Sequence, residues 1–207
     1  SDADFSTQAF PWLGCQQIKI GGTEVRAIRL SFAGELGYEL HTSATKLNTV
    51  WDALWEAGTK HRIRAFGTRA LDSLRLEKFY RGGHELSNDV GHLEVGQERF
   101  ASMGKSFVGR EALTNRDPGR KIALLKLPTN AQVPLGGEPV YCANQLMGSI
   151  SSAAYGHTVG YPIAIAFLDH TATVPGTELS ITLLGQSWPA VVLGDAPWDP
   201  GNHRLRT

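Results

Sequence analysis

One glutamate, Glu39, is the side chain best placed by its local sequence to bind a ligand. It lies in the segment GELGYEL at 34–40, after an alternating stretch that predicts a strand and before a stretch with helical spacing. A carboxylate at a strand end can face a pocket and accept two parallel hydrogen bonds from a planar donor, such as a guanidinium or a 2-amino-pyrimidinone ring. Taken alone, the local pattern favours a simpler alternative, a turn followed by a glutamate in water.

Other catalytic patterns are absent from the sequence. There is no GxSxG elbow, and Cys15 and Cys142 stand in no nucleophile or metal-ligand spacing. The pairs His84-Glu85 and His92 with Glu94 lack the HxxxH or HExxH spacing of a metal site. We therefore expect neither covalent hydrolase chemistry nor a bound metal, and the distant cysteines fit a reducing compartment rather than a disulfide scaffold.

Composition narrows the class of partner. The chain has 20 basic and 20 acidic residues, a formal net charge of zero and 42% hydrophobic residues, which is typical of a globular protein. Because no basic block stands out, duplex nucleic acid and an anionic membrane are poor candidates. No stretch approaches the roughly 18 apolar residues that span a bilayer. Gly21-Gly22 and Gly136-Gly137 precede predicted strands, so we interpret them as hairpin turns and expect no flavin in this segment.

The first part of the chain mixes strands and helices. Strands are predicted at 17–20 and 23–32 around Gly21-Gly22, then a helix from Thr42 or Ser43 to Gly58, and a second helix at 68–78. The expected apolar stripes are Leu47, Val50, Trp51, Leu54 and Trp55 on the first helix, and Ala70, Leu71 and Leu74 on the second, whose polar side carries Arg69, Asp72 and Arg75. A Gly-rich loop at 79–104 and a short helix at 109–115 follow.

The second part alternates short apolar runs with turn residues. Strands are predicted at 121–127, 138–141, 145–152, 162–168, 178–184 and 188–193. Strands without intervening helices suggest a small antiparallel β-barrel. We therefore predict an α+β protein, with an α+β module at residues 1–116 and a barrel domain at residues 117–207.

Five motifs occur in order along the chain: GELGYEL, TRALDSLRLEK, KSFVGREAL, SSAAYGHTVGYPIAIAF and WDPGNHRLR. In this order the chain resembles the C-terminal half of the folate-dependent aminomethyltransferase family, the glycine cleavage T-protein and its relatives. The DSLRLEK and SSAAYGHTVG variants look most like the folate-binding region of FAD-dependent dimethylglycine and sarcosine dehydrogenases.

The resemblance implies a fold and a ligand. In this family three modules form a ring around a channel that holds tetrahydrofolate, and the strand-end glutamate binds the pterin ring, a role that falls here to Glu39. An aromatic residue near the C-terminus lies close to the folate, and Trp198 takes that place, so stacking is kept while the usual tyrosine hydroxyl is lost. Tyr38, Arg75 and Tyr80 are lesser pocket candidates.

Departures from the family pattern affect the other side of the folate site. Leu71 precedes Asp72 where the T-protein has an arginine that contacts the glutamate tail, and Arg99 stands where an aromatic residue is expected. Arg99, Arg120 or Lys121 are candidates for the tail on charge alone. The family's catalytic aspartate belongs to an N-terminal half that this chain does not contain, so no catalytic residue is assigned here.

The sequence thus predicts the C-terminal fragment of a tetrahydrofolate-dependent enzyme, because the chain opens without Met on a linker-like SDADFSTQAFPW. The fragment is expected to be inactive by itself, because the family's catalytic aspartate and one wall of the folate pocket belong to the absent half. Its parent would oxidise an N-methyl amine with FAD bound in the absent N-terminal half, and capture the carbon as 5,10-methylenetetrahydrofolate, in the bacterial cytoplasm or the mitochondrial matrix. The alternatives are a non-catalytic folate-family binding or structural module, and a stand-alone folate-dependent O- or S-demethylase. Folate and the absent half are the expected partners, with no nucleic acid and no membrane.

Overall fold

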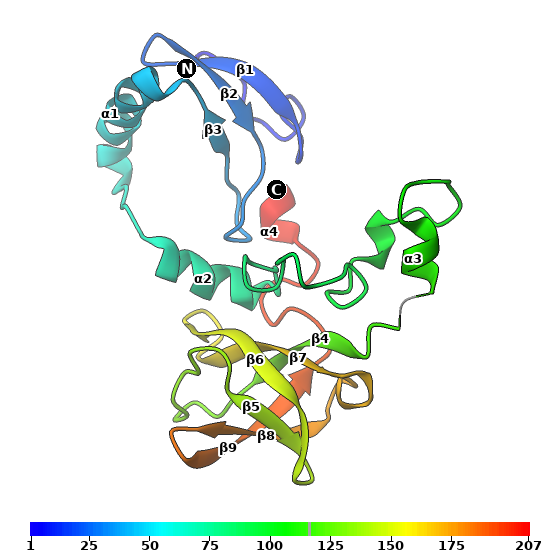
Figure 1. The fold of residues 1–207 in the computed structure, drawn as a ribbon. Coiled ribbons are helices and arrows are strands. Elements are labelled where there is room, and N and C mark those ends of the chain that lie inside the picture. Colours follow the sequence, from blue (N-terminus) through cyan, green and yellow to red (C-terminus); the bar gives the residue numbers. More distant parts are fainter. Residues whose placement is uncertain (116) are drawn as a thin grey trace. The chain divides into compact units, whose positions relative to one another are not determined.

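A computed structural model describes residues 1–115 and 117–207. The chain divides into two compact units, Ser1–Leu71 with Gly201–Thr207, and Asp72–Pro200 (Figure 1). We refer to them as unit 1 and unit 2. The boundary predicted at 116/117 falls on Arg116, which lies outside the described residues, and it stays a prediction.

Unit 1 is built on an antiparallel sheet in the order β1-β2-β3, with β1 at Cys15–Ile20, β2 at Thr23–Ile28 and β3 at Glu39–His41. The predicted hairpin is confirmed, since Ile20 pairs with Thr23 across Gly21 and Gly22, both at positive φ. β2 is shorter than predicted. Glu39 does not end that strand but opens a third one, which the sequence interpretation missed because three residues carry too little alternation to be recognised.

Helix α1 (Leu47–Gly58) follows a 3-10 turn, η1 (Ala44–Lys46), and is followed by η2 (Thr59–His61). It packs on the sheet through Val50, with Ala53 and Leu54 partly buried. The predicted apolar stripe was therefore wrong in part: Leu47, Trp51 and Trp55 are 52%, 56% and 39% exposed. The two tryptophan rings stack on each other instead, with centroids 5.4 Å apart. A short helix, α4 (His203–Arg206), belongs to the same unit.

Helix α2 (Thr68–Glu77) contains the division between the units. Its predicted faces are partly inverted. Ala70 is exposed, Leu71 and Leu74 are half-buried, and the buried residues are Ser73, Arg75, Leu76 and Glu77. A charged side chain can be buried in this way only when partners satisfy it, and those partners lie in unit 2.

The segment between α2 and the barrel is mostly irregular, as predicted for 79–104. It holds a 3-10 turn, η3 (Glu98–Phe100), and the helix α3 (Arg110–Thr114), which confirms the short helix predicted at 109–115.

The rest of unit 2 is a closed antiparallel barrel in the order β4-β7-β6-β5-β8-β9 (Figure 1). Each predicted strand is present: β4 at Arg120–Lys126, β5 at Pro139–Cys142, β6 at Gln145–Gly156, β7 at Tyr161–Asp169, β8 at Glu178–Leu183 and β9 at Gln186–Leu193, with a 3-10 turn, η4, at His170–Ala172. Its interior is filled by aliphatic side chains such as Leu125, Val140, Leu168 and Ile181. The α+β fold class with a small barrel is confirmed.

Candidate functional site

Glu39 lies on the polar face of the unit 1 sheet. Along β3, Leu40 packs into the core while Glu39 and His41 point to the opposite face, because successive side chains of a strand alternate. Register places Arg26 of β2 beside His41, and Gln17 of β1 beside Arg26. This face therefore carries polar and charged side chains from all the strands of the sheet.

The Glu39 carboxylate makes one exposed contact with the neighbouring His41 side chain. Its Oε2 lies 3.3 Å from Nε2 of His41, and the two side chains are 48% and 56% exposed. An ion pair this open contributes little to stability, so it leaves the carboxylate able to accept hydrogen bonds from a ligand. The Glu39 side chain is half exposed in the described chain, and its role as a pterin ligand stays a prediction.

A groove of about 590 Å³ begins next to Glu39, at His41. Its walls are the β1–β2 hairpin and residues 41–46, and its charged lining consists of Glu24, Arg26 and Lys46, with His41 beside them. Glu39 itself does not line it. The groove and the carboxylate are thus neighbours on one sheet face within one compact unit.

The Tyr38 ring packs in an aromatic cluster and does not face an open pocket. Its ring lies 5.3 Å from the rings of both Phe5 and Phe10, edge-on to the first and tilted to the second. Phe10 is fully buried in the core of unit 1. The cluster fixes the chain where it enters β3, which positions the adjacent Glu39.

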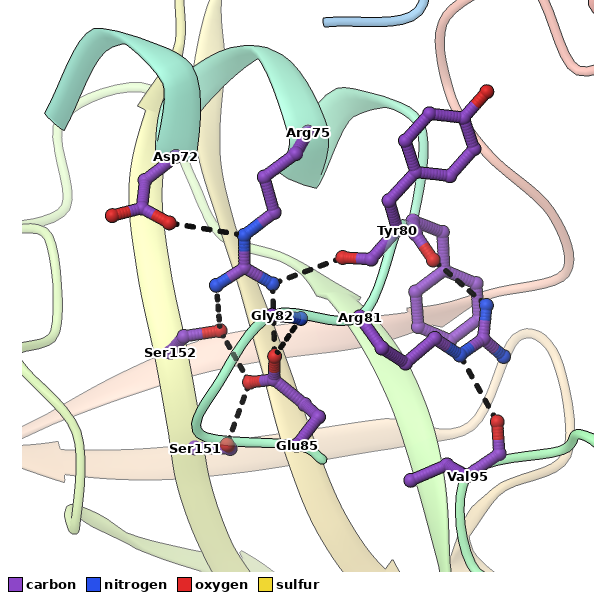
Figure 2. A network of polar contacts seen from close by, with 10 residues as sticks. Asp72, Arg75, Tyr80, Arg81, Gly82, Glu85, Val95, Ser151 and Ser152 are labelled. Atoms are coloured by element: carbon purple, nitrogen blue, oxygen red, sulfur yellow. Dashed lines mark hydrogen bonds and ion pairs between the residues drawn. The ribbon is translucent and has the colours of Figure 1, made fainter. Parts of the chain in front are cut away.

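In unit 2, Arg75 lies at the centre of a buried polar network (Figure 2). Its Nε donates to Asp72, three residues earlier on the same helix, at 3.2 Å. One terminal nitrogen donates to Tyr80 O at 3.0 Å and to Glu85 at 2.9 Å, and the other donates to Ser152 at 3.0 Å. Since most donors of the guanidinium are engaged inside the protein, its role as a folate contact stays a prediction.

Glu85 closes the network from the Gly-rich loop. It accepts from Ser151 and Ser152 of β6, both at 2.6 Å, and from the backbone amide of Gly82 at 2.7 Å (Figure 2). Burial raises the pKa of Glu85, but these hydrogen bonds and the Arg75 charge outweigh it, so the pKa lies below its ordinary value. The sequence interpretation treated Glu85 only as a failed metal ligand. The paired serines Ser151 and Ser152 in the motif SSAAYG were the one feature of the sequence that could have pointed to a hydrogen-bonded partner on this strand.

The end of α2 also fixes Trp198 and the residue after it. The backbone carbonyl of Glu77 accepts from the Trp198 amide at 3.1 Å, while its Oε1 accepts from the amides of Thr158 and Val159 at 2.6 and 3.2 Å. Lys78, nearly fully buried, donates to the carbonyl of Asp199. Trp198 and Tyr80 are both half-buried in unit 2, and their contacts with folate stay predictions.

The three candidates for the glutamate tail all have partners in unit 2. Arg120 pairs with the buried Glu94 at 2.7 Å and lies over the ring of Phe167. Lys121 lies 3.8 Å from Glu98, and Arg99 lies over the neighbouring Phe100 ring. Their assignment to the tail remains a prediction.

The described residues add two further facts. Among them, no three His, Cys, Asp or Glu side chains gather where they could hold a metal ion. No helix in residues 1–115 and 117–207 combines the length and the apolarity needed to cross a bilayer.

The fold and the ordered motifs define an aminomethyltransferase-type protein. The structure of the glycine cleavage system aminomethyltransferase T from Bartonella henselae matches with a TM-score of 0.82 at 19% identity, over 93% of this chain and 54% of that one. Residues 1–105 match the GCVT N-terminal domain, and residues 120–199 match the glycine cleavage T-protein C-terminal barrel domain. The chain belongs to the glycine cleavage T-protein family.

The chain is also similar to longer dehydrogenases and to an oxidase. It is 32% identical to human mitochondrial dimethylglycine dehydrogenase over 98% of this chain, and 36% identical to mouse mitochondrial sarcosine dehydrogenase over 99%. It is 35% identical to 4-methylaminobutanoate oxidase (formaldehyde-forming) of Paenarthrobacter nicotinovorans over 100% of its length. The chain spans about a quarter of each of these relatives, 24%, 24% and 26%.

Proposed function

We propose that this chain binds tetrahydrofolate and forms the folate-binding part of an FAD-dependent N-methyl amine dehydrogenase. The observation that carries the proposal is the position of Glu39, a half-exposed carboxylate on the polar sheet face of a glycine cleavage T-protein family member. The aromatic cluster of Tyr38, Phe5 and Phe10 anchors the chain at the residue before Glu39.

The residues present fit a reduced pterin. A 2-amino-pyrimidinone ring offers a ring N–H and an exocyclic amine side by side, and a carboxylate accepts both in the bidentate geometry that is strongest for such pairs. Among the residues that the structure describes, the partner that Oε2 of Glu39 would give up is His41, whose Nε2 lies 3.3 Å away in an exposed contact. Holding the ring in this way would fix N5 in space, and positioning is itself a large part of catalysis.

In the complete protein, a flavin would supply the two-electron oxidation that converts the N-methyl amine to an iminium. Tetrahydrofolate would then take the one-carbon unit as its N5,N10-methylene derivative, and the demethylated amine would leave. For this chain the step assigned is binding and orientation of the pterin. Relatives in mitochondria and bacteria support the same two compartments for this protein.

Calorimetric titration of the full-length protein with tetrahydrofolate tests the proposal. Glu39→Gln keeps the shape of the side chain but offers one carbonyl oxygen instead of two charged acceptors, so affinity should fall by about 10- to 100-fold, the effect of losing 1.5–3 kcal/mol from a charged hydrogen bond. Glu178→Gln is the matched control, since Glu178 is an exposed strand residue of unit 2. No binding by the wild type, or equal affinities for wild type and Glu39→Gln, would refute the role of Glu39.

A second candidate is release of the carbon as free formaldehyde, favoured by the relative named as formaldehyde-forming. Turnover in the presence of tetrahydrofolate separates the two. Methylenetetrahydrofolate formed in proportion to amine consumed supports the first proposal, and formaldehyde formed at the same yield with or without folate supports the second.

A further inference from the structure

Residues Gly201–Thr207 belong to unit 1, where a buried arginine binds the end of this segment. Arg29, which follows β2, is 1% exposed, and its terminal nitrogens donate at 2.7 Å to the backbone oxygens of Phe10 and Thr207. Leu205 of α4 is 3% exposed, so apolar packing also holds the segment. Because a buried guanidinium is costly unless its donors are satisfied, the contact with Thr207 stabilises both partners.

The same segment makes a second contact with the connection between β2 and β3. Nε of Arg204 donates to Oε2 of Glu35 at 2.7 Å. Arg29 begins this irregular connection, Glu35 lies within it, and Glu39 opens the strand to which it leads. Residues 201–207 therefore hold the connection both at its start and at Glu35.

Phe10 links the Arg29 contact to Glu39. Its carbonyl accepts from Arg29, and its fully buried ring lies 5.3 Å from the ring of Tyr38, the residue before Glu39. In the described chain, β3 pairs with β2 over Glu39–His41 alone. A ladder this short opens easily by local fluctuation, so the contacts that hold the connection contribute to the orientation of the Glu39 carboxylate.

We propose that Arg29 and Arg204 are positioning residues for the pterin site. Through their contacts with and within residues 201–207 they fix the β2–β3 connection, and thereby the direction of the Glu39 carboxylate. The proposal rests on the proposed function, because it requires the pterin ring at Glu39. A bidentate contact needs both carboxylate oxygens in line with the two donors, so a carboxylate on a mobile backbone loses affinity although its chemistry is unchanged. Neither arginine has to touch the ligand.

The test uses the exposed Arg204, because loss of the buried Arg29 would also destabilise unit 1. Tetrahydrofolate affinity and urea unfolding are measured on the same full-length variants. Arg204→Gln should bind about two- to fivefold more weakly, the range for loss of one exposed ion pair, with little change in the unfolding midpoint. Arg204→Glu should bind more weakly still, since it places a like charge against Glu35. Arg204→Lys keeps the cation and should stay within about twofold of the wild type.

Arg64→Gln is the matched control, because Arg64 is an exposed arginine of unit 1 outside these contacts. It should keep the wild-type affinity for tetrahydrofolate. An Arg64→Gln variant that binds as weakly as Arg204→Gln would assign the loss to net charge and overturn the positioning role.

A double-variant cycle shows whether Arg204 acts through Glu39. In a Glu39→Gln background, Arg204→Gln should change the affinity by less than about twofold, because the carboxylate that it orients is gone. Equal affinities of the wild type and Arg204→Glu, or the same loss with and without the Glu39 carboxylate, would overturn the positioning role and leave folate binding intact. Failure of the wild type to bind tetrahydrofolate would overturn the proposed function itself.

Discussion

Arg75 at the end of α2 donates to Glu85 in the Gly-rich loop over 2.9 Å, and the two side chains are 2% and 0% exposed. Ser151 and Ser152 of β6 both donate to the Glu85 carboxylate, and Ser152 also accepts from Arg75 (Figure 2). The network therefore joins a helix, a loop and a barrel strand of unit 2. Nothing in the local sequence of α2 indicates that Arg75 is buried while Arg69 is exposed. This pair organises the segment that leads from α2 to the barrel.

Glu85→Ala should destabilise unit 2 by about 3–5 kcal/mol, because it leaves the charge of Arg75 buried without its partner. Urea unfolding of the full-length protein measures the change, and hydrogen exchange of peptides from residues 79–97 reports it locally.

Glu35→Ala is the control for that experiment. Glu35 lies 2.7 Å from Arg204, but the two side chains are 42% and 56% exposed, so the cost should stay below about 1 kcal/mol. Equal losses in the two variants would show that burial adds nothing to the Arg75–Glu85 pair.

The free energy of unfolding should fall at acidic pH because Glu85 becomes protonated. Its pKa is lowered in the folded protein, since the hydrogen bonds from Ser151, Ser152 and Gly82 and the Arg75 charge outweigh burial, which raises it. The unfolded state therefore binds a proton more readily, so the stabilisation is fully present above the unfolded pKa of about 4.5 and is lost as pH falls below it through the folded value. Glu85→Gln should flatten the slope of unfolding free energy against pH in that window. An unchanged slope would contradict this assignment.

Gly148→Ala should disrupt the barrel, with a loss of about 3 kcal/mol or more. Gly148 in β6 has φ +153, and an added Cβ would overlap the carbonyl oxygen of Phe167 on the paired strand β7. Gly185→Ala is the matched variant, since Gly185 also has positive φ, +78, with nothing within 4 Å of the added Cβ. Its cost should be about 1–2 kcal/mol from the backbone alone. Thermal unfolding of both variants distinguishes steric overlap from backbone strain.

Glu77→Ala should expose the turn after β6. The Glu77 side chain is 1% exposed, and its Oε1 accepts from the part-buried amides of Thr158 and Val159, so removal takes away their acceptor at a cost of about 1 kcal/mol. Hydrogen exchange of these two amides should accelerate in Glu77→Ala and far less in Glu77→Gln, which keeps an acceptor oxygen. Slow exchange in the alanine variant would show that other groups satisfy the turn.

Alternation and turn residues were enough to predict the barrel strands, because both signals are local. Each strand from β4 to β9 overlaps its predicted range, and Gly21-Gly22 forms the expected hairpin. The third strand of unit 1 could not be predicted, since Glu39–His41 is defined by its pairing with β2 rather than by its own pattern. The same holds for helix faces: helical spacing predicts a stripe, but Trp51 and Trp55 stack on each other in solvent while Val50 turns inward.

The sequence by itself determined the fold class, the family and Glu39 as the carboxylate to consider, because these follow from short-range patterns and ordered motifs. Only the tertiary structure decided that Arg75 and Glu77 are buried and hydrogen-bonded inside the protein, whereas Arg26 and Lys46 line an open groove. The physical reason is that the partners of a charged side chain come from residues that are distant in the sequence and are brought together only by folding. The spacing of residues along the chain does not specify these long-range contacts.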